Sequence, residues 1–230
     1  MAARWMLIGM CSVGCMVPPT TMGLRSSAEL LREGAPAEAG VHAGMGGQYN
    51  TAPEEHVGAL PMGGDIAVHI PGTSLDLAGS GSWAPVLVQD IEGAPSQTLL
   101  PLSSGQAEVR FGTDTTRRAD QMMWMAGVGA TRVRIATDGV VTPDATMYIG
   151  PYIGWMLGTQ TRWGPHLYGG YKVNPVFNDG YRALWSTGTV GLRASADRRV
   201  RLGAELTGAV GTEGFGGFGH VYATSRLGGR

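Results

Sequence analysis

The chain carries little charge and almost no cysteine, and it lacks the features of several common functional classes. Only 15% of its 230 residues are charged, and the formal net charge is −1. Because nucleic-acid phosphates are bound by a basic stripe, this balance excludes nucleic acid as an expected partner. Long amphipathic helical segments are missing between the apolar runs of the carboxy-terminal half. Their absence argues against an α/β domain.

Both cysteines lie in the first fifteen residues, and neither indicates a metal or redox site. Arg4 is followed by an apolar run that ends near Cys15. This run of about ten residues is too short for a membrane-spanning helix, which needs about 20, but it is typical of a secretory signal. We therefore expect residues 1–15 to be a signal peptide and the protein to be exported, with no metal site and no cofactor.

The end of this segment, Ser12-Val13-Gly14-Cys15, resembles the lipobox of bacterial lipoproteins. In that motif small residues precede a cysteine that is lipidated and becomes the first mature residue. The resemblance implies lipidation at Cys15, although Ser12 stands where the motif usually has leucine. Simple cleavage by signal peptidase is the alternative.

Residues 16–60 are rich in Pro, Gly, Ala and Ser, and only Leu24 to Glu33 has the pattern of a short helix. This composition predicts a flexible, disordered linker, followed by a folded domain over residues 61–230. The neighbouring residues Glu54, Glu55 and His56 are expected to be solvated and not to bind a metal.

Period-two alternation from residue 145 onward is the most informative feature of the chain. The odd positions from Ala145 to Leu157 are mostly apolar, whereas the even positions are mostly Gly and Tyr. Between Val200 and Val210 the even positions are mostly apolar, and the charged residues stand on the odd positions. Such alternation predicts strands, and their length of about nine to fifteen residues is what a tilted strand needs to cross a bilayer.

Turn residues divide this region into regular segments that short connections force to be antiparallel. The fold class predicted is all-β, an antiparallel up-and-down barrel of about eight strands, because bacterial barrels close with an even number. Residues 85–104 contain several breakers and are expected to form a long loop. The strands are expected at residues 64–70, 75–83, 107–111, 121–136, 145–160, 163–177, 181–194, 199–211 and 215–227.

Strand length and the placement of aromatic residues favour a membrane barrel over a soluble one. Aromatic residues near strand ends are typical of the interfacial girdles of membrane proteins; here they are Trp124, Trp155, Trp163, Tyr181 and Trp185. Over residues 64–227 the chain resembles the small bacterial outer-membrane barrels of the OmpA and OmpX type, which implies a place in the bacterial outer membrane and lipid as a partner. Such barrels commonly end in an aromatic residue, whereas this chain ends at Arg230. The alternative is a secreted soluble barrel that binds a small apolar ligand.

Charged and polar residues on the inward faces are expected to pair in a lumenal polar network, because an unpaired buried charge costs several kcal/mol. Glu205 is expected to pair with a neighbouring arginine and Glu108 near Arg110. The network is predicted from Glu108, Arg110, His166, Lys172, Arg199, Arg201, Glu205, His220 and Arg226.

The function predicted is structural or passive, with tyrosine side chains filling the lumen and with loops as a contact for an envelope protein. Two alternatives remain open. One is a lipid acyl hydrolase built from His166 or His220 with Ser186 and Glu205, although no Gly-x-Ser-x-Gly motif marks the serine. The other is a small pore, if the barrel has ten strands or more.

Overall fold

A computed structural model describes residues 36–51, 54–91, 97–112, 120–137, 140–141, 145–160, 165–178, 181–195, 199–212 and 214–228. The predicted signal peptide and Cys15 lie outside these residues. The described residues contain no helical segment with the length and hydrophobicity of a membrane span.

The described residues form antiparallel strands joined by short connections. The strands are β1 (Ala37–Thr51), β2 (Glu54–Ala59), β3 (Met62–His69), β4 (Leu75–Ala84), β5 (Val86–Ile91), β6 (Gln97–Leu99), β7 (Leu102–Gly112), β8 (Asp120–Val133), β9 (Ile135–Thr137), β10 (Val140–Val141), β11 (Thr146–Gln160), β12 (His166–Asn178), β13 (Tyr181–Ser195), β14 (Val200–Gly211) and β15 (Gly214–Leu227).

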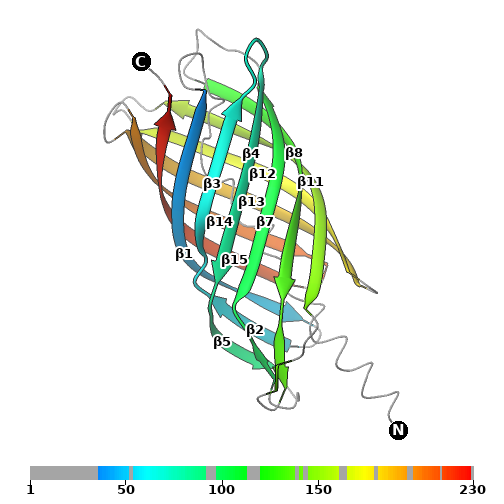
Figure 1. The fold of residues 1–230 in the computed structure, drawn as a ribbon. Coiled ribbons are helices and arrows are strands. Elements are labelled where there is room, and N and C mark those ends of the chain that lie inside the picture. The colour runs from blue at the N-terminus through cyan, green and yellow to red at the C-terminus, as the bar shows by residue number, and fades with distance from the viewer. Residues whose placement is uncertain are drawn as a thin grey trace.

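Ten of these strands close into a barrel in the order β1-β3-β4-β7-β8-β11-β12-β13-β14-β15, and β15 pairs with β1 (Figure 1). The prediction of an antiparallel up-and-down barrel is confirmed, but the count of about eight strands is wrong. The strand that the prediction missed is β1, which is rich in Gly and Ala. These residues have low strand propensity, and the pairing of β1 on both edges overrides it.

The segment expected to be a flexible linker therefore contributes to the barrel wall from Ala37 onward. β2 also lies in that segment, and it continues β3 in the same register against β1: Ala59 pairs with Gly46, and Met62 pairs with Ala43. The two strands are one wall strand interrupted at Leu60 and Pro61, because proline has no N–H to donate to the ladder.

Pro85 interrupts the neighbouring wall strand in the same way, between β4 and β5. β5 pairs with β2, while β6 pairs with β9 in a small second sheet that also contains β10. The long loop expected at residues 85–104 is therefore mostly strand. These extensions lie at the end of the barrel away from the C-terminus (Figure 1).

The register fixes the size of the barrel. Following paired residues once around the wall from Ala37 of β1 leads back to Tyr49 of β1, an offset of twelve residues. The path runs through Val68, Leu77, Val109, Ala126, Ile153, Val173, Ser186, Val210 and Phe215. For ten strands this offset gives a tilt of about 40° and a backbone diameter of about 20 Å.

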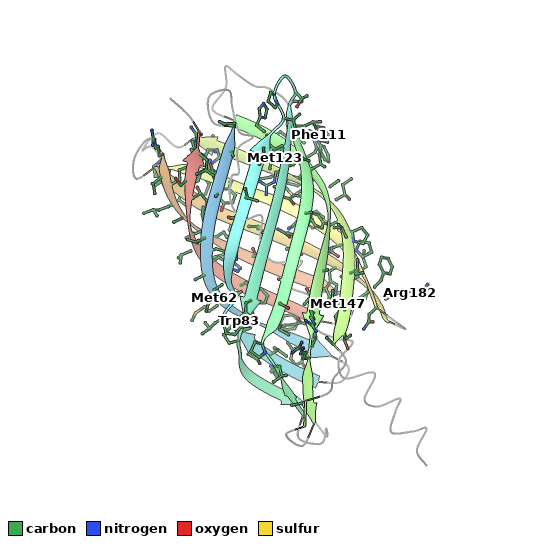
Figure 2. All side chains as sticks on the ribbon, in the orientation of Figure 1. Met62, Trp83, Phe111, Met123, Met147 and Arg182 are labelled. Atoms are coloured by element: carbon green, nitrogen blue, oxygen red, sulfur yellow. The ribbon has the colours of Figure 1, made fainter. Side chains whose placement is uncertain are left out.

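Apolar side chains face outward all around the barrel, and polar ones face inward. Ile153 is 61% exposed and Leu206 is 66% exposed, whereas Thr207 beside it is buried. Figure 2 shows the side chains standing away from the outer wall, Phe111 and Met147 among those labelled. A soluble barrel has the opposite arrangement, so the secreted soluble alternative is wrong.

The aromatic residues expected near the membrane surfaces divide between the two faces. Trp124 is exposed on the outer wall and Trp155 is half-buried there. Trp185 is fully buried inside the barrel, because it shares the inward phase of β13 with Thr187 and Thr189. The side chains of Trp163 and Tyr181 lie outside the described residues.

Inside the barrel, at the end where β2 and β5 extend the wall, buried apolar side chains meet in one cluster, here called the apolar plug. Its largest members are Trp185 on β13 and Tyr148 on β11, two strands that are separated in the wall by β12. The plug comprises Val57, Ala59, Ala84, Leu102, Val133, Tyr148, Val176, Ala183, Trp185 and Ala209.

Candidate functional site: the lumen

Large inward side chains lie over glycines of the next strand. Tyr168 covers Gly191, its partner on β13, and Tyr222 covers Gly203, its partner on β14. Trp185 covers Gly211 in the same way. A Cβ atom at any of these glycines would collide with the covering ring. The inward glycines thus make room for the side chains that fill the lumen, as the Gly and Tyr alternation in the sequence indicated.

Glu108 on β7 is the centre of the first polar cluster. Arg110 donates to its Oε1 atom through Nε, and the Tyr152 hydroxyl donates to Oε2 at 2.6 Å. Lys172 lies over the Tyr152 ring, with Nζ 4.9 Å from the ring centre. Both carboxylate oxygens of this buried glutamate are therefore satisfied, which stabilises the negative charge inside the barrel.

Glu205 on β14 is the centre of the second cluster. The Tyr168 hydroxyl lies 3.0 Å from Glu205 Oε2 and 2.9 Å from the Tyr222 hydroxyl. Since a hydroxyl has one proton, Tyr168 donates to the carboxylate and accepts from Tyr222. His220 lies on the other side, with Nδ1 3.9 Å from Oε1, and its ring contacts His42 at 6.2 Å in an edge-on arrangement.

The two clusters repeat one arrangement across three strands. Tyr152 pairs with Gly127, which pairs with Glu108. Tyr168 pairs with Gly191, which pairs with Glu205. In each case the tyrosine crosses over the glycine and reaches the glutamate two strands away.

At the end opposite the apolar plug, further polar side chains surround the opening of the lumen. His69 Nδ1 lies 2.8 Å from Oδ1 of the buried Asp76. Next along the wall, Arg201 Nη1 on β14 lies 3.5 Å from Oε2 of Glu38 on β1, the strand that pairs with β3. This end, where the described chain stops at Gly228, is called the mouth below.

Most residues predicted for the lumenal network point into the barrel, and one does not. The buried ones are Glu108, Arg110, His166, Lys172, Arg201, Glu205 and His220. Arg226 is half-buried at the mouth. Arg199 is exposed in the bend before β14, because the strand begins one residue later, at Val200.

Several inward residues of these clusters were missed by the sequence reasoning. Glu38 and His42 lie in the segment interpreted as a linker. Asp76 was placed on a strand but was not assigned to the network, and Tyr152 was expected to fill the lumen but not to bind Glu108. The alternation of β4 and β11 carried the signal for both, since each shares its face with other inward residues.

The hydrolase alternative fails on the position of Ser186. This serine faces outward, where Tyr171 donates a hydrogen bond to it at 2.8 Å, whereas His166, Glu205 and His220 face inward. The sequence held the necessary signal, because Ser186 shares its phase with Leu184 and Val190. Among the described residues no three His, Cys, Asp or Glu side chains form a metal site.

Comparison with known proteins gives the fold but no family. No protein-family model and no curated protein matches the chain. The transport unit of the autotransporter AIDA-I from Escherichia coli is similar in structure, with a TM-score of 0.52 and 6% identity, over 91% of this chain and 95% of that one.

Two further solved structures share the fold. The β domain of the Bordetella autotransporter BrkA has a TM-score of 0.51 and 13% identity, over 85% of this chain and all (100%) of that one. An outer-membrane channel from Pseudomonas putida has a TM-score of 0.50 and 9% identity, over 88% of this chain and all (100%) of that one. Together with the apolar outer wall, this likeness defines the protein as a β-barrel of the bacterial outer-membrane class.

Proposed function

We propose that the protein is a non-conducting outer-membrane barrel with a passive, structural role. The observation that carries this proposal is the apolar plug, in which Trp185 and Val176 are 0% exposed and Tyr148 is 1% exposed. The plug lies across the lumen at one end, so a solute that enters at the mouth meets a packed apolar segment.

A small pore is the second candidate, and the ten-strand count favours it. With a backbone diameter of about 20 Å, this barrel is wider than an eight-stranded barrel. In an eight-stranded barrel the side chains by themselves can fill the interior. Here the additional width is occupied, because large side chains cover the inward glycines and the plug closes one end. An ion that passes through an apolar constriction must lose its hydration shell. The free-energy cost of this dehydration prevents ions from passing through such a barrel.

We further propose that the plugged end faces the outside of the cell. Outer-membrane barrels have short turns on the periplasmic side and longer loops on the extracellular side. The longest connections here, between β4 and β7 and between β8 and β11, both lie at the plugged end. The bilayer lipid contacts the outer wall, and these connections are the surface we propose for an envelope protein partner.

Conductance measurements test the passive role. The purified full-length chain, inserted in a planar lipid bilayer, is expected to show no steady openings. Trp185→Ala, which removes the largest side chain of the plug, is expected to produce openings, whereas the matched change Leu184→Ala on the outer wall is not. Steady openings of the native protein would refute the passive role and establish the pore.

A further inference from the structure

The outer wall has two neighbouring hollows that lie over β12 to β2. The larger has a volume of about 620 Å³ and lies over Gly188 and Gly208, and its outward lining side chains are Trp155, Leu157, Val190 and Leu206. The smaller has a volume of about 340 Å³ and lies over Gly47, Gly58 and Gly217, and its outward lining side chains are Tyr49, His56 and Phe215.

One row of paired glycines forms the floor of both hollows. Gly188 of β13 pairs with Gly208 of β14, which pairs with Gly217 of β15. The row continues through Gly47 of β1 to Gly58 of β2. The two hollows are therefore one trough, called the glycine groove below.

Internal packing does not explain the glycines at the deep end of this groove. The inward glycines make room for rings of the lumen, whereas a Cβ at Gly188 or Gly208 would meet no atom within 4 Å. Glycine weakens the interior of a strand, and it often marks a place where a ligand closely approaches the backbone. The open space over these two positions lies outside the wall, so their occupant is outside the wall as well.

Apolar side chains line both long sides of the groove. On the side of the mouth, Val190 pairs with Leu206. On the side of the plugged end, Val210 pairs with Phe215, which pairs with Tyr49. The two sides are four residues apart along each strand, which is about 14 Å between Cα atoms. The side chains take up much of this width, and a single hydrocarbon chain fits between them.

The groove extends from the plugged end to the centre of the wall. Tyr49 and Phe215 lie within two residues of the ends of β1 and β15, whereas Gly188 is the central residue of β13. The Tyr49 ring lies 5.3 Å from the Phe215 ring and 4.7 Å from the His56 ring, so the end at the membrane surface is aromatic. From Gly58 to Gly188 the row crosses four strand spacings, about 19 Å, which is close to the roughly 15 Å that an acyl chain covers in one leaflet.

The position and shape of the groove decide its occupant. It lies within the lipid-facing wall of an outer-membrane barrel, so the bilayer supplies what fills it. A second copy related by a two-fold axis would place hollow against hollow and leave both unfilled. A straight acyl chain contacts the glycine floor and both sides along its length. Such close packing is what stabilises association inside a bilayer, where the hydrophobic effect does not contribute.

We propose that the glycine groove binds one straight acyl chain of a lipid in the leaflet at the plugged end. The lipid headgroup lies beside the exposed His56, and the chain runs over the glycines toward Trp155. A chain that carries methyl branches is too wide for the trough. This site goes beyond the passive role, because it exists whether or not the barrel conducts.

Native mass spectrometry of the full chain in a non-ionic detergent tests the proposal, because lipids without a specific site exchange for detergent. The native protein is expected to retain a single molecule of added dimyristoyl phosphatidylcholine. Retention of diphytanoyl phosphatidylcholine, whose chains carry methyl branches, should be about tenfold lower, because branched chains lose contact with the floor.

Filling the groove should have the same effect. The double variant Gly188→Leu, Gly208→Leu should retain dimyristoyl phosphatidylcholine about tenfold less, because the new side chains occupy the trough. Both positions have open space for a side chain, so the variant is expected to fold. The matched control is Ala126→Leu, which adds the same side chain at an exposed position in the middle of β8, outside the groove, and should leave retention unchanged.

Three results would overturn the proposal. They are no retained lipid on the native protein, equal retention of the straight and branched lipids, and equal retention by the native protein and the folded double variant. A dimer that is lost in the double variant would show that a second copy occupies the groove, and would overturn it too. If the double variant does not fold, the comparison of the two lipids on the native protein decides alone.

Discussion

Replacing Ile153 by arginine tests the membrane assignment most directly. Ile153 is at the centre of β11, faces outward and is 61% exposed. In a lipid bilayer this position lies near the midplane, where an arginine must be taken out of water. In a protein that is surrounded by water, the same side chain would already be solvated.

The expected cost follows from the depth of the position. Arginine on the lipid face of a barrel costs about 2–4 kcal/mol at the bilayer midplane and about 0–1 kcal/mol near the interfaces. Ile153→Arg should therefore lower the free energy of unfolding by about 2–4 kcal/mol. Met147→Arg, on the same face of β11 but next to the strand end, should cost about 1 kcal/mol or less. An exposed substitution in water normally changes stability by about 0.5 kcal/mol at most.

The measurement is reversible unfolding in guanidinium chloride of the native chain and the two variants in phospholipid vesicles, followed by tryptophan fluorescence. The midpoint should fall in the order native, Met147→Arg, Ile153→Arg, at an unchanged slope. Equal midpoints for the two arginine variants, both close to native, would show that the outer wall is not in hydrocarbon.

Three further predictions concern the lumen. Gly203→Ala places a Cβ against the Tyr222 ring and should cost about 1–3 kcal/mol of unfolding free energy in the same assay, whereas Gly208→Ala, with no atom within 4 Å of its Cβ, should be close to neutral. Glu108→Ala leaves Arg110 buried without its carboxylate and should cost about 3–5 kcal/mol, so a cost under about 1 kcal/mol would contradict the described pairing. Tyr152→Phe removes one hydrogen bond to the Glu108 carboxylate and should cost about 1.5–3 kcal/mol, while the outward Tyr171→Phe should cost less than about 1 kcal/mol.

Period-two alternation predicted the strands and their facing well wherever each face had one chemical character. From Met147 to Leu157 every outward position was identified, and the inward tyrosines Tyr148 and Tyr152 were placed in the lumen. The same rule, applied to β13, would have moved Ser186 to the outer wall and Trp185 to the interior. The signal for both was the alternation of β13: Ser186 stands on the same even positions as the apolar Leu184 and Val190, and Trp185 stands on the odd positions.

The parts that could not be predicted depend on contacts distant in sequence. β1 has Gly or Ala at many positions, and nothing local marks it as a strand. Its pairing with β15 and with β2 and β3 is visible only when the barrel closes. The partners of Glu205 were missed for the same reason, since Tyr168 reaches it across an intervening strand through space left by Gly191.

The seam between β1 and β15 joins the first described strand to the last, from Ala37 opposite Leu227 to Asn50 opposite Gly214. A chain emerging from synthesis or export has β1 long before it has β15. Until then one edge of β1 has no partner, and the entropy of closing a loop of nearly the whole domain opposes its pairing. The barrel therefore acquires its continuous wall only in the last step of folding. Up to that step the incomplete sheet exposes both an apolar face and a free edge, and both favour aggregation.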